Sequence, residues 1–379
     1  MLKIIKDLYN GQQPDCFILI QELKFIFPLL LEYQDTPQDE IWHAEGNVLI
    51  HTMMVLDEVY KIINTQKLSK DDQVVLILAA LLHDIAKPIT TITEFSEREN
   101  RICVKAPKHE IIGRDYLAYR LLELGINEYV YKNVISLVAY HQVPKMLVIR
   151  NKDRYDYIHH MQMVNYKLMY LLEVADIKGR LCHDEESQLQ YLEEYKMFCE
   201  EYELVTTDSY NDVIGTYLIS KNELYSLDEA EHKLWDHKNH SHVTVLCGIP
   251  GSGKSSSVTG DNVISLDTIR KEIGDINYKK SSEVLLIAKE RLKECLRKKE
   301  DVIYDATNYR KDFRQKIFDL CHAYHARVTV HMIMKPLKQC LIDNRGRDNQ
   351  VDDGYIIHQS NRFEFPEYGE YHELKITLK

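Results

Sequence analysis

The sequence predicts a two-domain protein, in which an all-α N-terminal domain is followed by an α/β domain built on a parallel sheet. Three observations support this prediction. The chain has 379 residues, more than a single hydrophobic core usually holds. Apolar residues recur three and four positions apart from Ile18 to about Cys199, which is the period of an α-helix. From Val243 onward, strand-like apolar runs alternate with helical patterns, as in sheets whose helices cover both faces.

Composition and charge narrow the class of protein. Hydrophobic residues make up 45% of the chain and charged residues 28%, as in soluble globular proteins. The net charge of −11 argues against a broad electrostatic grip on long nucleic acids, so a polyanionic substrate would need local basic groups or metal ions. The longest purely apolar run, Val74–Leu82, is far shorter than the roughly 20 residues that span a bilayer. The N-terminal stretch also lacks the features of a signal peptide, so we expect a cytoplasmic protein with no membrane partner.

A buried helix carries the first candidate metal ligands. The pattern over 71–87 is apolar on nearly all sides, which predicts a core helix, yet His83 and Asp84 lie near its end. A carboxylate at that end opposes the helix dipole, and burying it costs several kcal/mol unless it is paired or bound to a metal. Lys87, three residues further on, could pair with it.

Further histidine and aspartate side chains are expected to point inward from separate predicted helices, namely His51 (helix 47–63), His109, His141 and Asp176. Each of these residues alone is more often an ordinary core residue than a ligand. Together with His83 and Asp84, they are difficult to explain without cations. The sequence therefore predicts a metal site in the all-α domain.

The domain boundary is marked by a weakening of the helical periodicity of apolar residues. We predict a first domain over 1–200, a connecting segment over 201–241 and a second domain over 242–379. The connecting segment ends in the polar run DHKNHSH at 236–242. A histidine-rich tract can bind metal, but a solvated linker is the favoured interpretation.

The second domain is expected to alternate strands and helices. Its predicted strands cover 243–247, 262–266, 301–305 and 327–333. Its predicted helices begin at Lys254 and cover 267–273, 282–298, 311–324 and 336–345.

The most specific motif, G-x-x-x-x-G-K-S, follows the first of these strands. It belongs to the stretch VTVLCGIPGSGKS at 243–255. Glycines let successive backbone N–H groups surround a phosphate, a lysine reaches the β- and γ-phosphates, and the serine hydroxyl can bind Mg²⁺. The alternative is a chance Gly/Ser-rich turn. We expect a nucleoside triphosphate such as ATP to bind here, with Mg²⁺ on Ser255. The expected binding residues are Gly248, Gly251, Ser252, Gly253, Lys254, Ser255 and Ser256.

Charged residues near the ends of the later strands complete this candidate site. Asp267 is placed to accept a proton from an attacking hydroxyl, although it could instead simply cap the next helix. Arg270, one turn later, could bind a phosphate on the acceptor. Asp305, in DATN, is expected at the same edge of the sheet as Asp267. Arg345 and Arg347 lie in a polar segment that could close over the triphosphate, or could form a solvated basic turn.

The order H…HD…H…H…D resembles that of the HD-domain metal-dependent phosphohydrolases. The segments WHAEGNVLIHT and LAALLHDIAKP are similar to the HD domains attached to tRNA nucleotidyltransferases. The resemblance implies one or two divalent transition metal ions, the first on His51, His83, Asp84 and Asp176, and a second on Asp84, His109 and His141. It also implies that Lys87 faces the phosphate oxygens, with Arg180 as another candidate for that role and His43 and Glu45 as supporting residues.

The motifs GIPGSGKS, D-x-x-R, DATN and R-x-R resemble the polynucleotide 5′-kinase branch of phosphate-loop phosphotransferases. Joined in one chain, the two halves resemble bacterial RNA end-healing enzymes. This implies metal-dependent hydrolysis of 2′,3′-cyclic, 2′- or 3′-phosphate ends, phosphorylation of 5′-hydroxyl ends of RNA or DNA, and a separate RNA ligase as partner. Two alternatives are a small-metabolite kinase fused to an HD nucleotidase, and an HD module that binds nucleotides without turnover.

Overall fold

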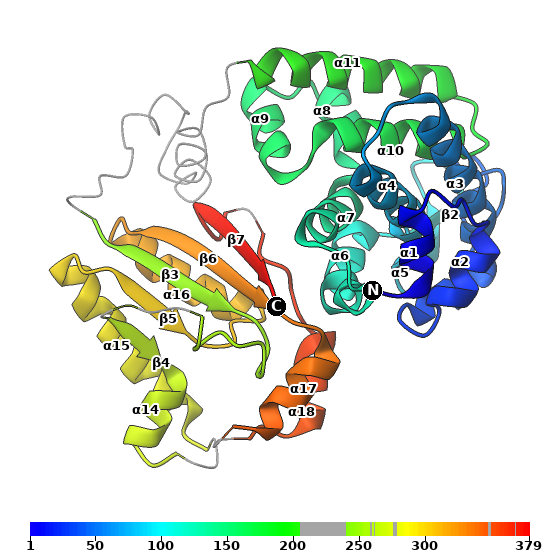
Figure 1. Ribbon diagram of the computed structural model, residues 1–379. Helices are drawn as coiled ribbons and strands as arrows, with labels where there is room; N and C mark the ends of the chain where they lie inside the picture. The colour runs from blue at the N-terminus through cyan, green and yellow to red at the C-terminus, as the bar shows by residue number, and fades with distance from the viewer. Residues whose placement is uncertain (205–239, 258–259, 261, 276–278, 348–349, 368) are drawn as a thin grey trace. The chain divides into compact units, whose positions relative to one another are not determined.

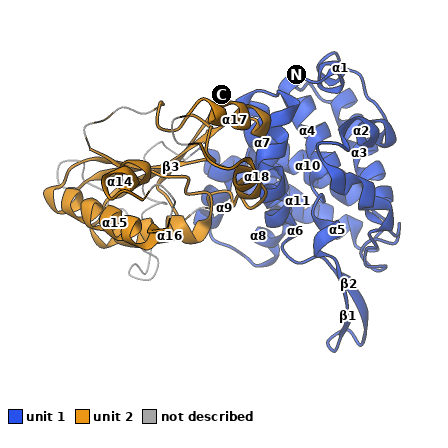
Figure 2. Cartoon of the chain, turned by 90° about the horizontal axis from the view of Figure 1, so that it is seen from below, with its two compact units in different colours: residues 1–206 blue, residues 207–379 orange. Residues whose placement is uncertain are grey.

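The computed structural model describes residues 1–204, 240–257, 260, 262–275, 279–347, 350–367 and 369–379 (Figure 1). The chain divides into two compact units, Met1–Thr206 and Thr207–Lys379 (Figure 2). Most of the predicted connecting segment 201–241, including the start of the histidine-rich run at 236–242, lies outside the described residues.

The first unit is helical, which confirms the fold class predicted for this half. Its elements are α1 (Lys3–Tyr9), α2 (Cys16–Leu23), the 3-10 helix η1 (Pro28–Asp35), α3 (Val48–Thr65), α4 (Lys70–Leu82), α5 (Lys87–Thr90), β1 (Ile92–Ser96), β2 (Arg101–Lys105), α6 (His109–Arg120), η2 (Leu121–Leu124), α7 (Glu128–Tyr140), α8 (Val143–Ile149), α9 (Arg154–Met163), α10 (Tyr166–Lys178) and α11 (Glu185–Glu203).

Helix α4 forms the centre of this unit. Every residue from Val74 to Leu82 is buried, and α3, α7 and α10 pack against the helix. Among the described residues, one helical stretch, Lys70–Thr90, is long and apolar enough to cross a membrane, but 78% of its most apolar part is buried inside the protein. It therefore has the character of a core helix.

The predicted helix over 71–87 is interrupted. Helix α4 ends at Leu82, and residues 83–86 form turns before the short helix α5 begins at Lys87. Pro88 gives the physical reason, because its ring would clash with the carbonyl of Asp84 in a continuous helix. The interruption turns His83 and Asp84 into the interior at a helix end.

A two-stranded hairpin in the first unit was not predicted. Strands β1 and β2 pair antiparallel, with Ile92 opposite Lys105, and Figure 2 shows the hairpin extending away from the helices of this unit. Most of β1 is solvent-exposed, so its sequence carries no buried alternating face. A prediction based on hydrophobic periodicity therefore could not identify the hairpin.

The second unit contains a parallel sheet, as predicted, but with five strands instead of the four predicted, in the order β4-β5-β3-β6-β7. The central strand β3 therefore carries the phosphate-loop motif at its carboxyl end. The elements are β3 (His242–Cys247), β4 (Val263–Ser265), α14 (Leu266–Glu272), α15 (Ser281–Lys298), β5 (Val302–Asp305), α16 (Lys311–Ala323), β6 (Arg327–Met334), α17 (Leu337–Arg345), α18 (Asp353–Asn361) and β7 (Glu373–Leu378).

Two features of this unit differ from the prediction. No helix begins at Lys254 among the described residues there, since 254–257 form a turn in which the Ser257 N–H donates to the Lys254 carbonyl (3.0 Å). The hydroxyls of Ser256 and Ser257 both donate to the Gly253 carbonyl, and such local bonds compete with helix formation. Helix α18 and strand β7 were not predicted, and the polar segment before α18 was interpreted as a lid or a solvated basic turn.

Candidate functional sites

The histidines and aspartates predicted to bind metal converge on one buried site in the first unit. Helices α3 and α10 contribute His51 and Asp176, the turn after α4 contributes His83 and Asp84, the first residue of α6 is His109, and His141 caps the end of α7. None of these residues is more than 8% exposed. Six polar side chains from five helical segments therefore face one another in the core.

Asp84 divides the cluster into two groups that could each hold an ion. On one side, His51 Nε2 lies 3.3 Å from His83 Nε2 and 3.0 Å from Asp176 Oδ1, and His83 Nε2 lies 3.3 Å from Asp84 Oδ2. On the other side, His109 Nε2 lies 3.1 Å from His141 Nε2 and 3.3 Å from Asp84 Oδ1. Each carboxylate oxygen of Asp84 thus faces its own pair of imidazoles.

The tautomers of the four imidazoles follow from their second nitrogens. Each Nδ1 lies within hydrogen-bond distance of a backbone carbonyl, which can only accept. The partners of His51, His83, His109 and His141 are, in turn, Gly179 (3.2 Å), Ala80 (2.9 Å), Ala106 (2.8 Å) and Val138 (2.9 Å). Because each Nδ1 then carries a proton, Nε2 is the ring nitrogen that faces the cluster, and it can bind a metal when it carries no proton, as in metal-bound histidines.

The environment of Asp84 fits a cation. The side chain is 1% exposed, and neither of its oxygens accepts a hydrogen bond of regular geometry within the described part of the chain. Lys87 Nζ forms an ion pair with Oδ2 at 2.7 Å and donates to Gln38 Oε1 at 2.5 Å. Although burial opposes ionisation, the charges of His83 and Lys87 hold the pKa of Asp84 well below its usual value. An ionised, buried carboxylate whose two oxygens each lie 3.3 Å from an imidazole Nε2 fits a site for a divalent ion.

Two imidazoles of the cluster have pKa values shifted in opposite directions, since burial lowers the pKa of His141 whereas that of His51 is raised. Burial opposes the charge of His51, but hydrogen bonds to Asp176 and Glu45 raise its pKa to about 9. Glu45 Oε1 lies 3.1 Å from His51 Nδ1 and 2.8 Å from His43 Nδ1, and its Oε2 accepts from the Leu181 N–H. Glu45 and His43 thus lie beside the ring nitrogen that faces away from the cluster, where a supporting role is expected.

Three buried or half-buried cations surround this cluster. Lys87 and Arg180 were expected from the sequence, and the charge of Arg180 helps to lower the pKa of Asp176. Lys145 was not expected, yet its Nζ lies 3.7 Å from Asp176 Oδ2 and 3.3 Å from Glu173 Oε2. Glu173 is fully buried, and burial raises its pKa to about 7 although Lys145 opposes this shift. The sequence signal for Lys145 and for Glu173 was a charged residue on a helix face that apolar residues otherwise occupy.

The phosphate-loop motif adopts a loop that only glycine permits at two positions. Gly251 has φ +83°, and a Cβ there would lie 2.1 Å from the Cys340 carbonyl oxygen. A Cβ on Gly248 would lie 2.5 Å from the Ile333 carbonyl oxygen. The loop therefore packs directly on the backbone at the end of β6 and on α17, with no room for side chains.

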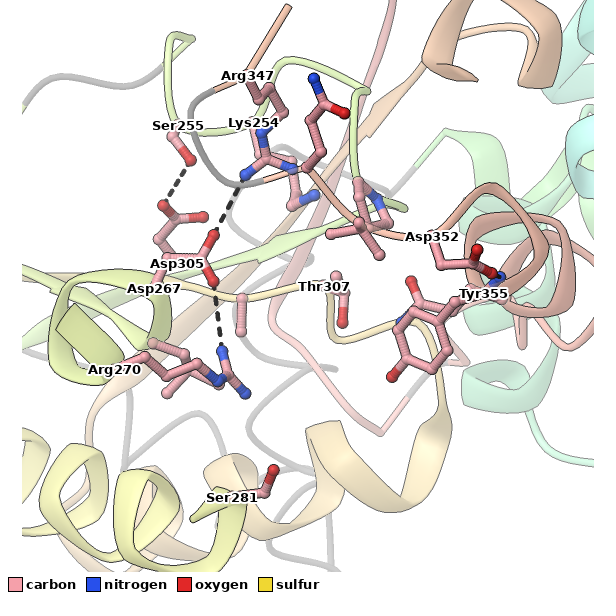
Figure 3. Close-up of a pocket in the computed structure, with 16 residues that line it drawn as sticks. Lys254, Ser255, Asp267, Arg270, Ser281, Asp305, Thr307, Arg347, Asp352 and Tyr355 are labelled. Carbon is pink, nitrogen blue, oxygen red and sulfur yellow. Dashed lines mark hydrogen bonds and ion pairs between the residues drawn. The ribbon is translucent and has the colours of Figure 1, made fainter. Parts of the chain in front are cut away.

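Lys254 and Ser255 lie where the motif predicts contacts to phosphates and Mg²⁺. Burial lowers the pKa of Lys254 to about 8, and its Nζ donates to the Ile249 carbonyl (2.9 Å). The hydroxyl of Ser255, the residue expected to bind Mg²⁺, donates to Asp305 Oδ2 (2.7 Å), so these two side chains meet at one edge of the sheet (Figure 3). Ser252 is fully buried within the loop, and Ser256 is exposed.

A cavity of about 730 Å³ opens beside the loop, and Figure 3 shows its lining. Asp267 lies between two arginines, at 3.3 Å from Arg270 Nη1 and 3.2 Å from Arg347 Nη2. Ser265, not Asp267, caps helix α14, since Ser265 Oγ accepts from the Thr268 N–H at 3.5 Å. The carboxylate of Asp267, in the first turn of α14, is therefore available to the cavity.

The two lid arginines have different positions. Arg347 lines the cavity, whereas Arg345 lies outside the described lining, is 69% exposed and pairs with Asp353 at 3.3 Å. The lining also includes residues that sequence reasoning did not select, among them Thr307 and Tyr355. Tyr355 comes from the unpredicted helix α18, so no sequence pattern pointed to it.

Comparison with protein-family models agrees with these two sites. Residues 48–178 match the model described as HD domain, and residues 243–366 match the model described as AAA domain (AAA_33). The first match contains every candidate metal ligand of the cluster, and the second contains the phosphate loop, Asp267, Asp305 and both lid arginines. The chain thus joins an HD hydrolase-type domain to a phosphate-loop, kinase-like domain.

Proposed function

We propose that this chain, an HD domain fused to a phosphate-loop kinase-like domain, is a bifunctional enzyme that heals broken RNA ends. The HD half would remove or open 2′,3′-cyclic, 2′- or 3′-phosphates, and the kinase half would phosphorylate 5′-hydroxyl ends. The observation that carries the proposal is the presence in one chain of a carboxylate-bridged histidine cluster and a separate phosphate loop whose cavity holds Asp267 and Arg270.

The hydrolytic half rests on the residues around Asp84. His51, His83 and Asp84 would hold one ion together with Asp176, whose Oδ1 lies 3.0 Å from His51 Nε2, and Asp84, His109 and His141 would hold a second. When bound, two divalent ions at such a site lower the pKa of a bound water and neutralise phosphate charge. Lys87, whose ammonium already faces the bridging carboxylate, would turn to a phosphate oxygen of the RNA end. Arg180 would add positive charge at the same site.

The kinase half rests on the residues around Asp267. The 5′-hydroxyl oxygen would attack the γ-phosphorus of the nucleoside triphosphate, the bond to the β–γ bridging oxygen would break, and Asp267 would take the hydroxyl proton. Lys254 and Arg347 would stabilise the negative charge on the transferring group. Arg270, 3.3 Å from Asp267, would bind a phosphate that the acceptor already carries.

The two activities make chemical sense together. Many ribonucleases leave a 2′,3′-cyclic or terminal phosphate on one fragment and a 5′-hydroxyl on the other, whereas ligation requires a free 3′-hydroxyl and a 5′-phosphate. An enzyme that converts both ends would act before a separate RNA ligase. The net charge of −11 favours recognition of ends over recognition of long tracts.

One experiment tests both halves. The protein is incubated with Mn²⁺, Mg²⁺, ATP and an oligoribonucleotide that has a 5′-hydroxyl and a 2′,3′-cyclic phosphate, and both product termini are identified by mass spectrometry. We expect a 5′-phosphate together with a 2′- or 3′-phosphate or a free 3′-hydroxyl. An unchanged oligonucleotide, tested with Ni²⁺, Co²⁺ and Zn²⁺ as well, would contradict the proposal and would favour a small-metabolite kinase fused to a regulatory HD module.

A further inference from the structure

A buried ion pair lies beside the metal cluster and belongs to neither group of candidate ligands. Lys145, in α8, is 5% exposed, and Glu173, in α10, is 0% exposed. The distance from Lys145 Nζ to Glu173 Oε2 is 3.3 Å. Both charges are therefore withdrawn from water inside the helical unit.

Stability alone does not account for this pair. Desolvating two charges costs several kcal/mol, which their attraction repays only with good geometry, and a well-packed apolar pair is often as stable or more stable. Neither oxygen of Glu173 has a hydrogen bond of normal geometry among the described residues. A functional role that requires a fixed positive charge on Lys145 would explain why the Lys145–Glu173 pair is buried here.

The neighbour that such a charge can act on is Asp176. Lys145 Nζ lies 3.7 Å from Asp176 Oδ2, while the other oxygen, Oδ1, lies 3.0 Å from His51 Nε2 and 3.8 Å from His83 Nε2. The two oxygens of Asp176 thus face opposite partners. Glu173 and Asp176 are three residues apart on α10 and share one face of the helix, so Glu173 keeps Lys145 next to Asp176.

We propose that Lys145 and Glu173 position Asp176 for metal binding. Lys145 holds Oδ2 and so presents Oδ1 to the ion, and Glu173 fixes Lys145 in that place. This inference rests on the metal centre of the proposed function, but not on its RNA substrate. Lys145 is a positioning residue here, in contrast to Lys87, which contacts the Asp84 oxygen that faces the imidazoles.

The contrast with Lys87 makes the assignment specific. Lys87 Nζ lies 2.7 Å from Asp84 Oδ2, an oxygen that the metal itself would use, so Lys87 must move when an ion binds. Lys145 forms an ion pair, at 3.7 Å, with the Asp176 oxygen that does not face the imidazoles, so an ion on Oδ1 would leave this ion pair intact. The ion pair would therefore order Asp176 both with and without metal, as outer-shell partners of metal ligands do.

Mn²⁺ binding tests the proposal without any substrate. The full chain is stripped of metal with a chelator, and bound Mn²⁺ is obtained from the electron paramagnetic resonance signal of the free ion during a titration. We expect Lys145→Met to weaken one class of Mn²⁺ site by about 10- to 100-fold. Lys145→Arg, which keeps the charge, should retain affinity within several-fold of wild type.

A double variant separates positioning from folding. Lys145→Met combined with Glu173→Leu leaves no unpaired buried charge, so the melting temperature of the metal-free protein should stay close to that of wild type. We expect its Mn²⁺ affinity to fall as far as that of Lys145→Met. ATP turnover at the kinase site, in the other unit, should be unchanged in all variants.

The outcomes distinguish this inference from the proposed function. Unchanged Mn²⁺ affinity in the folded double variant would overturn the positioning role. An unchanged Mn²⁺ affinity with a raised KM for a phosphate ester would also overturn it, because Lys145 would then bind substrate. Wild-type protein that binds no Mn²⁺ would overturn the metal centre itself, and this inference with it.

Discussion

Single side chains define what each site can bind. In the first unit, the Nδ1 contacts of four histidines direct their Nε2 atoms toward the two oxygens of the Asp84 carboxylate. In the second unit, the Ser255 hydroxyl and the Asp305 carboxylate meet at 2.7 Å, where a Mg²⁺ ion is expected. At this scale the sequence was informative, because each of these residues interrupts an apolar or glycine-rich pattern with a group that carries chemistry.

Metal binding should release protons at neutral pH. His51 has a pKa of about 9 in the metal-free protein because Asp176 and Glu45 accept hydrogen bonds from its protonated ring. An ion can bind its Nε2 only after that proton leaves, so metal affinity should rise as the pH increases towards about 9 and fall as the pH decreases.

Calorimetric Mn²⁺ titrations at pH 7 in two buffers of different ionisation enthalpy measure this proton release. We expect close to one proton from His51 per protein. Equal heats in the two buffers would contradict the assignment of His51 as a ligand.

The two lid arginines provide a matched pair of substitutions. Arg347→Ala should lower kcat of the kinase by about 10²- to 10³-fold, because Arg347 lines the cavity and contacts Asp267. Arg345→Ala should stay within about threefold of wild type, since Arg345 is 69% exposed and pairs with Asp353. Steady-state kinetics with saturating ATP compare the two, and a larger loss for Arg345→Ala would show that the lid is arranged differently during catalysis.

At the scale of elements, the metal cluster depends on close packing between α3 and the end of α10. A Cβ on Gly179 would lie 2.6 Å from the backbone nitrogen and Cα of Val55 in α3. The Gly179 carbonyl also accepts from His51 Nδ1 at 3.2 Å. Glycine at this position therefore lets α10 carry Asp176 to within 3.0 Å of His51.

Gly179→Ala should separate these helices and weaken the metal site. We expect a loss of about 1–3 kcal/mol in unfolding free energy, the usual cost of overpacking, together with reduced Mn²⁺ binding. Gly346→Ala is the control, since Gly346 has ordinary helix-compatible backbone and its closest neighbour to an added Cβ is 3.7 Å away. Chemical denaturation and metal content report the two effects, and a Gly179→Ala protein as stable and metal-rich as the control would refute the packing argument.

Elements were predicted well where they are buried and poorly where they are not. The strands β3, β5 and β6 were found within about one residue of their bounds because apolar runs of that length suit a parallel sheet. The exposed hairpin β1–β2 and the polar start of α18 gave no such signal. The break after Leu82 was missed because the apolar pattern of α4 continues past it, and Pro88, which acts on the carbonyl of Asp84, lies four residues beyond Asp84.

At the scale of the whole molecule, length, helical period and strand–helix alternation were enough to predict one helical and one α/β unit. The sequence also identified the six candidate metal ligands, but it could not separate Arg345 from Arg347 or reveal the Lys145–Glu173 pair. These depend on which side chains tertiary packing brings together, and no spacing along one helix encodes that. The two candidate sites lie in different compact units, so each should lose its activity independently.

The most direct test of the account uses the two isosteric variants Asp84→Asn and Asp267→Asn in one assay. Each is incubated with Mn²⁺, Mg²⁺, ATP and the oligoribonucleotide that has 5′-hydroxyl and 2′,3′-cyclic phosphate ends. We predict that Asp84→Asn leaves the cyclic phosphate intact while it still phosphorylates the 5′ end. Asp267→Asn should process the cyclic phosphate while 5′ phosphorylation falls by about 10²- to 10⁴-fold. Loss of both reactions in either folded variant would contradict the account of two separate sites.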